Sequence, residues 1–197
     1  GVAAADATEP IWWAAVPWEK DGQGIYTDEF TFVMQDRQYE VDTKGKTLIH
    51  VNALDEGQSV GYYGAVLEAP GDDRIVEVFD DQRGDMTWSL REEDGTYTIA
   101  LSPHDAVLGY DGGGSREFTV LDWKENEYIY VKNIDEGGIS RFHRLVPTDL
   151  IKRITFEVDT TPTGNPNEYS FAISNIVKTP QNLEIESLTW DLVTATK

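Results

Sequence analysis

The sequence of 197 residues has no cysteine and only three histidines. The lack of cysteine excludes a disulfide framework, a thiolate metal site and a cysteine nucleophile. His50, His104 and His143 lie far apart and lack the i, i+2 or i, i+4 spacing of zinc ligands, so zinc chemistry is not expected. The G-x-S-x-G signature of a serine nucleophile is also missing. The sequence therefore carries no signature of these enzyme classes.

Basic residues and long apolar runs are also scarce. Lys and Arg number 16 against 36 Asp and Glu, which gives a formal net charge of −20. Such a chain repels phosphate backbones and anionic polymers, so we expect no nucleic acid partner and favour a neutral ligand. Solubility is a simpler explanation of the acidic excess. No apolar run approaches the roughly 20 residues of a membrane-spanning helix, so we expect a protein that does not span a membrane.

Helix signals are few, and short segments of alternating apolar and polar residues recur from Phe30 onward. This pattern predicts an all-β fold, an antiparallel β-sandwich or barrel of the lipocalin-like or jelly-roll-like kind. Turns such as Asp42 to Gly45 and Glu93 to Gly95 hold residues that tolerate positive φ, which predicts pairing of adjacent strands. The predicted strands are 29–34, 38–41, 47–51, 87–91, 96–101, 116–121, 127–131 and 140–145.

Three stretches depart from this pattern. Asp111-Gly112-Gly113-Gly114 lacks the helix and the Lys-Ser/Thr pair of a P-loop, so a hairpin turn is predicted there. Residues 53–85 are predicted to be a long irregular connection with one short helix or strand at 75–79. Composition changes near residue 147. We therefore predict a ligand-binding β domain over 1–147 and a small β appendage over 148–197, with strands at 154–158, 168–174 and 183–191.

Aromatic side chains are the best candidates for ligand contacts, because a flat ring stacks on the C–H face of a sugar while polar neighbours bind the hydroxyls. Trp12 and Trp13 in an extended segment would point to opposite faces, so at most one is readily buried. Trp123 lies in a polar turn, where packing does not readily explain it. The candidates are Trp12, Trp13, Trp18, Trp123, Tyr62 and Tyr110, whereas Trp88, Phe118, Tyr128 and Trp190 lie in strand patterns and are predicted to be core.

Catalysis by paired carboxylates has no local motif in this sequence. Retaining glycoside hydrolases need carboxyl groups about 5 to 5.5 Å apart, and the Glu-x-Asp-x-x-Glu pattern is absent. We therefore expect no enzyme activity. Two alternatives stay open: a hydrolase whose carboxylates come from separate strands, and a structural or assembly domain. No cofactor is expected, although calcium stays an alternative at Asp72-Asp73 and residues 80–85, which offer oxygen ligands without EF-hand spacing.

Several ordered motifs resemble one known family. IWWAAVPWEK at 11–20, GIYTDEFTF at 24–32, TWSL at 87–90, LGYDG at 108–112 and RFHRLVP at 141–147 resemble a domain of PKD-containing surface glycan-binding lipoproteins of Bacteroidetes polysaccharide-utilisation systems. The tail, 154–191, looks like the opening of a PKD module, which is immunoglobulin-like. The first resemblance covers most of residues 1–147.

The resemblance implies binding of a neutral polysaccharide without cleavage, with β-glucans such as laminarin among the ligands. It also implies a place on the extracellular face of the outer membrane, or secretion, and contact with outer-membrane glycan-uptake proteins. The run Gly1 to Ala5 lacks the charged and apolar regions of a signal peptide. We therefore expect either a processed chain or one that is not exported.

Overall fold

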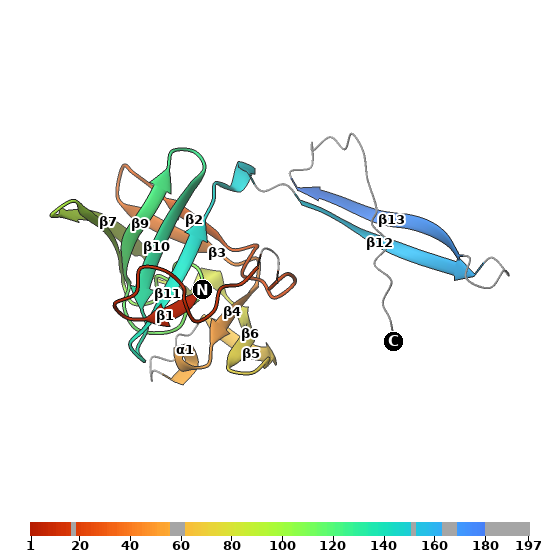
Figure 1. The fold of residues 1–197 in the computed structure, drawn as a ribbon, viewed down its shortest axis with the longest axis horizontal. Helices are drawn as coiled ribbons and strands as arrows, with labels where there is room; N and C mark the ends of the chain where they lie inside the picture. Colours follow the sequence, from red (N-terminus) through yellow and green to blue (C-terminus); the bar gives the residue numbers. More distant parts are fainter. Residues whose placement is uncertain (17–18, 56–61, 151–152, 163–168, 180–197) are drawn as a thin grey trace. The chain divides into compact units, whose positions relative to one another are not determined.

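A computed structural model describes residues 1–16, 19–55, 62–150, 153–162 and 169–179. The chain forms two compact units, Gly1–Val146 and Pro147–Lys197. Almost all of the elements are strands (Figure 1). The short helices are α1 (Asn52–Asp55), η1 (Asp80–Gln82) and η2 (Thr148–Leu150). A search of the described residues finds no helix with the length and apolarity to cross a membrane.

The main sheet of the first unit has eight strands in the order β1-β11-β10-β9-β8-β7-β3-β2 (Figure 1). Strands that follow one another in sequence pair antiparallel from β7 to β11, as the turn residues predicted. Among the described strands, β1 and β2 form the two edges, so the sheet is not closed into a barrel. The strands are β1 Val2–Ala4, β2 Glu29–Phe32, β3 Gln38–Asp42, β7 Met86–Glu93, β8 Thr96–Ser102, β9 Glu117–Lys124, β10 Tyr128–Ile134 and β11 Ile139–Leu145.

A second antiparallel sheet has the order β4-β6-β5, with β4 at Lys46–His50, β5 at Tyr63–Glu68 and β6 at Asp73–Val78. The two sheets confirm the predicted all-β class, as a sandwich. They also show that an irregular connection over residues 53–85 was the wrong prediction, although β6 covers residues 75–78 of the short element expected at 75–79. The last four side chains of β5 are exposed and its pairing with β6 shifts register twice. Alternation is therefore weak in β5, which is why the sequence pattern missed it.

The core consists of two apolar clusters that follow the sheets. The larger cluster includes Trp88, Phe118 and Val131 of the main sheet, and the smaller includes Ile49 and Val76 of β4 and β6. The Trp88 indole also donates a 3.0 Å hydrogen bond to the Val33 carbonyl oxygen. Trp88 and Phe118 are thus core residues as predicted. Tyr128 is only half-buried and its hydroxyl donates to the exposed Asp122 carboxylate, so its predicted core position was wrong.

The predicted positive φ is found in two turns, but only the turn between β7 and β8 is a hairpin; β3 and β4, which flank the turn at residues 42–45, lie in different sheets, so the pairing predicted there was wrong. Lys44 and Gly45 have φ of 56° and 89°, and Asp94 and Gly95 have φ of 51° and 79°. Asp111-Gly112-Gly113-Gly114, by contrast, is no exposed hairpin turn: Asp111, Gly112 and Gly113 are buried. The His50 backbone N–H donates a 2.9 Å hydrogen bond to the Asp111 carbonyl oxygen, and a parallel bridge joins Asp111 to Ile49. This loop therefore ties the β8–β9 connection to the smaller sheet.

The second unit contains an antiparallel pair, β12 (Arg153–Pro162) and β13 (Tyr169–Thr179). β12 includes the predicted strand 154–158, and β13 includes residues 169–174 of the predicted strand 168–174. The predicted strand 183–191, with Trp190, lies outside the described residues. The likeness to a PKD module stays a prediction.

Candidate functional site

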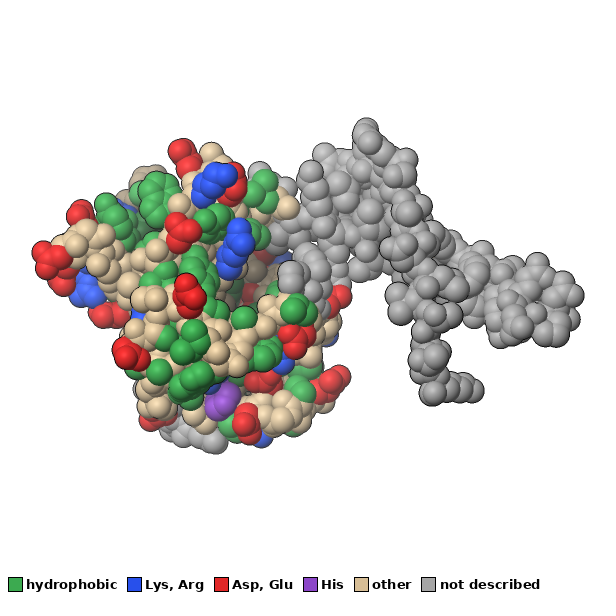
Figure 2. Space-filling view, in the orientation of Figure 1, with side chains coloured by type: hydrophobic (Ala, Val, Ile, Leu, Met, Phe, Trp, Pro, Cys, Tyr) green, Lys and Arg blue, Asp and Glu red, His purple; other side chains and the backbone are tan. Residues whose placement is uncertain are grey.

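The N-terminal segment presents two exposed indoles at the edge of the main sheet. The Val2 N–H donates a 2.8 Å hydrogen bond to the Trp13 carbonyl oxygen, which forms an antiparallel bridge beside β1. Trp12 and Trp13 are 59% and 41% exposed, and Ile11 and Val16 in the same segment are exposed too. Figure 2 shows hydrophobic side chains lying among acidic ones on one face of this unit. Both predicted platform residues therefore have indole surface open to solvent.

Polar groups lie directly beside Trp13. The Lys20 ammonium nitrogen lies 5.5 Å from the centre of the Trp13 ring and 3.0 Å from Asp73 Oδ2. The Tyr110 hydroxyl donates a 2.6 Å hydrogen bond to Asp73 Oδ1. Burial, together with this bond to a carboxylate, raises the pKa of Tyr110, which keeps the phenol neutral. We call Trp12, Trp13, Lys20, Asp73 and Tyr110 the aromatic surface.

A buried ion pair supports Tyr110 from behind. The Arg141 guanidinium lies 5.3 Å from the centre of the Tyr110 ring. Arg141 Nη2 lies 2.8 Å from Asp135 Oδ2, and the Asp135 side chain is 0% exposed. Because the ion pair is buried on one side and Asp73 holds the hydroxyl on the other, the Tyr110 ring has a fixed orientation. The aromatic surface thus combines the Trp13 indole with positioned hydrogen-bonding groups, and Trp12 is the exposed neighbour of Trp13 in the chain.

Trp123 is exposed as predicted, but the strand register places it away from the aromatic surface. β1 pairs with Ile139–Arg141 of β11, whereas Trp123 pairs with Ile129, which in turn pairs with Leu145. Along the strand direction, Leu145 lies four residues, or about 13 Å, from Arg141, the β11 partner of β1. Across the sheet, β9 lies three strand spacings, or about 14 Å, from β1. Trp123 is 61% exposed at the end of β9. It is therefore a separate exposed indole.

The remaining tyrosine and tryptophan candidates do not join the aromatic surface. Tyr62 is 1% exposed and packs in the smaller cluster. Its ring lies 4.4 Å from the Tyr63 ring and 3.8 Å below the Arg83 guanidinium. Because a buried ring cannot stack on a ligand, the prediction that Tyr62 binds one was wrong. Trp18 lies outside the described residues.

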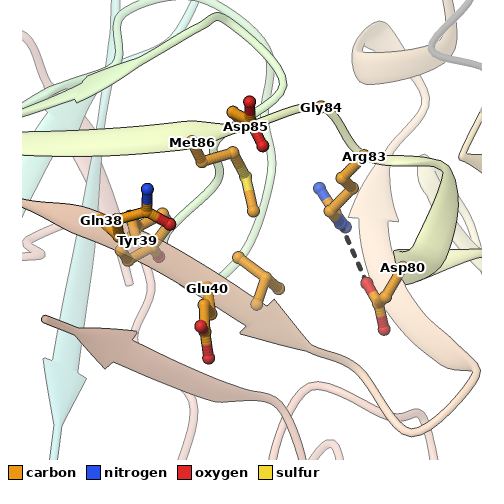
Figure 3. Close-up of a pocket in the computed structure, with 9 residues that line it drawn as sticks. Gln38, Tyr39, Glu40, Asp80, Arg83, Gly84, Asp85 and Met86 are labelled. Atoms are coloured by element: carbon orange, nitrogen blue, oxygen red, sulfur yellow. Dashed lines mark hydrogen bonds and ion pairs between the residues drawn. The ribbon is translucent and has the colours of Figure 1, made fainter.

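A pocket of about 320 Å³ lies elsewhere in this unit, between β3 and the segment that leads into β7 (Figure 3). Residues 38–41 of β3, Asp80 of η1 and residues 83–86 line it. Asp80 Oδ2 accepts hydrogen bonds of 2.8 Å from both the backbone N–H and the hydroxyl of Thr43. Sequence reasoning missed the pocket, since residues 80–85 have the composition of a charged surface loop.

Metal binding finds no support among the described residues, where no group of three or more His, Asp or Glu could hold an ion. Two of the carboxylates considered for calcium have other partners: Asp73 binds Lys20 and Tyr110, and Asp80 binds Thr43 and Arg83.

The most deeply buried histidine is His143, whose Nε2 lies 3.1 Å from Asn133 Oδ1. Burial lowers the pKa of His143 to about 3, so this imidazole is neutral at physiological pH. The charge of this imidazole therefore does not change near neutral pH.

Comparison of the chain with protein-family models, with curated proteins and with solved structures gives no match. The resemblance to surface glycan-binding lipoproteins therefore stays a prediction that rests on the quoted motifs. The geometry of the described residues carries the functional argument.

Proposed function

We propose that the first unit binds a neutral polysaccharide without cleaving it, through the aromatic surface. The observation that supports this most directly is the exposed Trp13 beside the hydrogen-bonded Lys20, Asp73 and Tyr110, with Trp12 exposed next to it in the chain. Indole faces bind the C–H faces of a pyranose, and the polar groups bind hydroxyls at its edge. The ligand that we would test first is a β-glucan such as laminarin. The proposed location is the extracellular face of the outer membrane, or secretion, alongside glycan-uptake proteins.

The charge of the protein favours a neutral chain over a uronic or sulfated one. With a formal net charge of −20, an anionic polymer is repelled at separations shorter than the screening length of about 8 Å. Neutral hydroxyls meet no such repulsion. Each stacked ring contributes on the order of 1 kcal/mol. Affinity is therefore modest for a short oligosaccharide and increases with chain length.

Replacing Trp13 with alanine is expected to weaken laminarin binding about fivefold, because one stacking face is lost. Isothermal calorimetry measures the change, and affinity electrophoresis with mixed-linkage glucan, xylan and mannan establishes which polymer is bound. Trp123→Ala is the matched control, because this indole is at least as exposed and lies in a different place. An equal loss in both variants contradicts the assignment to the aromatic surface.

Two assays separate this proposal from its alternatives. Release of labelled sugar from oligosaccharides would make the protein a hydrolase with carboxylates from separate strands. A concentration-dependent mass without binding to any of the four polymers would make it an assembly domain. Either result overturns non-catalytic polysaccharide binding.

A further inference from the structure

Apolar side chains on the core-bearing face of the main sheet become exposed toward one end of its strands. Trp88 and Leu101, a cross-strand pair, are buried in the larger cluster. One pair further along the same face, Leu90 lies opposite the buried Ile99, and Leu90 is 50% exposed. Cross-strand partners share a face of the sheet, so Leu90 lies on the core side. The apolar face of β7 and β8 therefore continues past the part that the core covers.

A β-bulge in β9 brings Trp123 to this same face. Val120 and Trp123 are three residues apart, so a regular strand would place them on opposite faces. Val120 lies opposite Val131 of β10, the register then shifts, and Trp123 lies opposite Ile129. Ile129 and Val131 are two residues apart and share a face, so Val120 and Trp123 share it too. Bulges re-aim side chains in this way and are over-represented beside functional sites.

The exposed end of this face forms one apolar strip across five strands, which we call the sheet-end surface. Its members are Leu90 of β7, Tyr97 of β8, Val120 and Trp123 of β9, Ile129 of β10 and Leu145 of β11. Trp123 is 61% and Tyr97 is 41% exposed, whereas the three aliphatic residues of β9 to β11 are half-buried against the larger cluster. β7 and β11 are four strand spacings apart, which corresponds to about 19 Å. The strip is long enough for about six extended residues.

The sheet-end surface lies away from the smaller sheet. The β8–β9 loop ties the other end of these strands to β4, because the His50 N–H donates to the Asp111 carbonyl oxygen. In Figure 1 the β7–β8 and β9–β10 turns project away from β4, β5 and β6. The described residues of the smaller sheet therefore leave this strip open to solvent.

Acidic turns border the sheet-end surface. Glu92 and Glu93 end β7, Asp94 follows in the β7–β8 turn, and Glu125 lies in the β9–β10 turn. All four side chains are exposed. Glu92 lies opposite Tyr97 and so shares the face of the strip. A ligand on the strip therefore meets carboxylates at both turns.

Basic residues near the strip do not cancel these charges, because they have partners of their own. Arg91 and Lys124 each form a 2.5 Å ion pair with a glutamate. The Arg144 guanidinium lies 4.3 Å from the centre of a tyrosine ring. Arg37 lies 4.6 Å from the centre of the Trp88 ring and is the cation nearest to Leu90 along this face. The carboxylates of the two turns outnumber it.

The chemistry of the strip and of its border selects the kind of partner. Mainly aliphatic side chains offer few hydrogen bonds to the hydroxyls of a sugar. The acidic turns repel a fatty carboxylate, and a second copy of the chain would bring the same acidic turns. We infer that the sheet-end surface docks a segment of another protein in which apolar side chains lie between basic ones. This role is independent of the aromatic surface and goes beyond polysaccharide binding.

Three synthetic peptides test the inference on the full chain by fluorescence anisotropy. KKLFLFKK has an apolar centre between lysines, EELFLFEE reverses the charge, and KKSGSGKK removes the apolar side chains. Eight extended residues span about 26 Å, which is enough to cross the strip. KKLFLFKK is expected to bind at least tenfold more tightly than either of the others, because binding needs both apolar burial and opposite charge. Raising the salt from about 0.1 M to about 1 M is expected to weaken it severalfold.

The variant that tests the apolar contact is Trp123→Ala. Loss of this indole is expected to weaken KKLFLFKK binding about tenfold, because exposed aromatic anchors contribute most to such interfaces. The fold is retained, since Trp123 is 61% exposed. Trp13→Ala is the matched control, because it removes an exposed indole from the aromatic surface, and it is expected to leave peptide binding unchanged.

The variant that tests the charge is the double substitution Glu92→Gln with Glu125→Gln. It is expected to weaken KKLFLFKK binding about fivefold and to narrow the difference from EELFLFEE. Asp6→Asn with Glu9→Gln is the matched control, because it removes the same net charge from exposed residues that follow β1. β1 lies three strands from β9 in the sheet. An equal effect of both double variants would mean that only the net charge of the protein attracts the peptide, which overturns the inference.

The remaining outcomes separate this inference from the proposed function. Equal affinity for the three peptides, or unchanged KKLFLFKK binding by Trp123→Ala, overturns the docking surface. Displacement of the peptide by laminarin would make the strip a glycan site, and a concentration-dependent mass that Trp123→Ala abolishes would make it a contact between copies; both overturn it. If Trp13→Ala weakens laminarin binding while no peptide binds, polysaccharide binding stands alone. If KKLFLFKK binds as expected and laminarin does not, the docking surface stands and the aromatic surface loses its proposed role.

Discussion

Replacing Asp28 with asparagine is expected to raise the free energy of unfolding above pH 7 by about 2–4 kcal/mol. Asp28 Oδ2 accepts a 2.5 Å hydrogen bond from the Thr47 hydroxyl, whereas Oδ1 is buried with no partner among the described residues. Burial, to which the nearby Asp80 carboxylate adds, raises the pKa of Asp28 from 3.8 to about 7. Asparagine has the shape of the neutral carboxyl and carries no charge to bury.

The direction of the pH dependence follows from that pKa. The folded protein holds a proton on Asp28 between about pH 4 and pH 7 that the unfolded chain releases. The stabilisation is complete below about pH 4 and is lost as the pH rises through 7. His143 acts in the opposite direction, because its pKa falls from 6.5 to about 3 on burial and stability is lost as the pH falls through that range. The two effects oppose one another between about pH 4 and 6.5.

The asparagine variant loses the opposing Asp28 effect, so the His143 dependence should become visible below about pH 6. Urea unfolding at half-unit steps from pH 4 to 9 is expected to give a wild-type curve that is nearly flat below pH 6.5, and a variant curve that falls steadily toward acid. Asp81→Asn, an exposed carboxylate in η1, should follow the wild type. Parallel curves for wild type and Asp28→Asn would mean that Asp28 titrates as an ordinary surface group.

The sequence predicts strands well where one face of the strand is buried. The predicted strand 96–101 matches β8, Thr96–Ser102, because Ile99 and Leu101 alternate inward while their neighbours are more exposed. The same rule fails for β5, an edge strand with register shifts and mostly exposed side chains. β6, Asp73–Val78, was expected only as a short helix or strand at 75–79, because its consecutive buried residues Ile75 and Val76 hide the alternation. Periodicity therefore identifies half-buried strands and misses the rest.

In the candidate site, features that depend on neighbouring residues could be predicted from the sequence, whereas contacts between residues far apart in the chain could not. The exposure of at least one of Trp12 and Trp13 follows from their adjacency in an extended segment, which is local, whereas the exposure of both does not. Lys20 and Asp73 are 53 residues apart, and nothing in either segment indicates that they meet. Tyr62 has the same glycine-rich neighbourhood as an exposed loop tyrosine, yet it is buried under Arg83. Burial depends on tertiary packing, which local composition does not contain.

Replacing Asp111 with alanine is expected to cost about 3–5 kcal/mol of stability. The Asp111 side chain is 3% exposed and lies in the loop that joins the two sheets. Its carboxylate accepts 3.0 Å hydrogen bonds from Arg116 Nη1, from the Tyr63 hydroxyl and from the Gly113 N–H. Alanine removes all three acceptor contacts and leaves the guanidinium of Arg116, which is 9% exposed, without its paired carboxylate. Thermal and urea unfolding measure the loss.

Asp122→Ala is the matched control, because Asp122 is exposed and accepts hydrogen bonds from Trp123 and Tyr128 at the surface. Its expected cost is within about 0.5 kcal/mol. A similarly small cost for Asp111→Ala would contradict a buried Arg116 pair. Tyr110 precedes Asp111 directly, so the alanine variant is also expected to bind laminarin more weakly at temperatures where it remains folded. The glycine-rich loop would then set both the joining of the sheets and the position of a ligand-contacting ring.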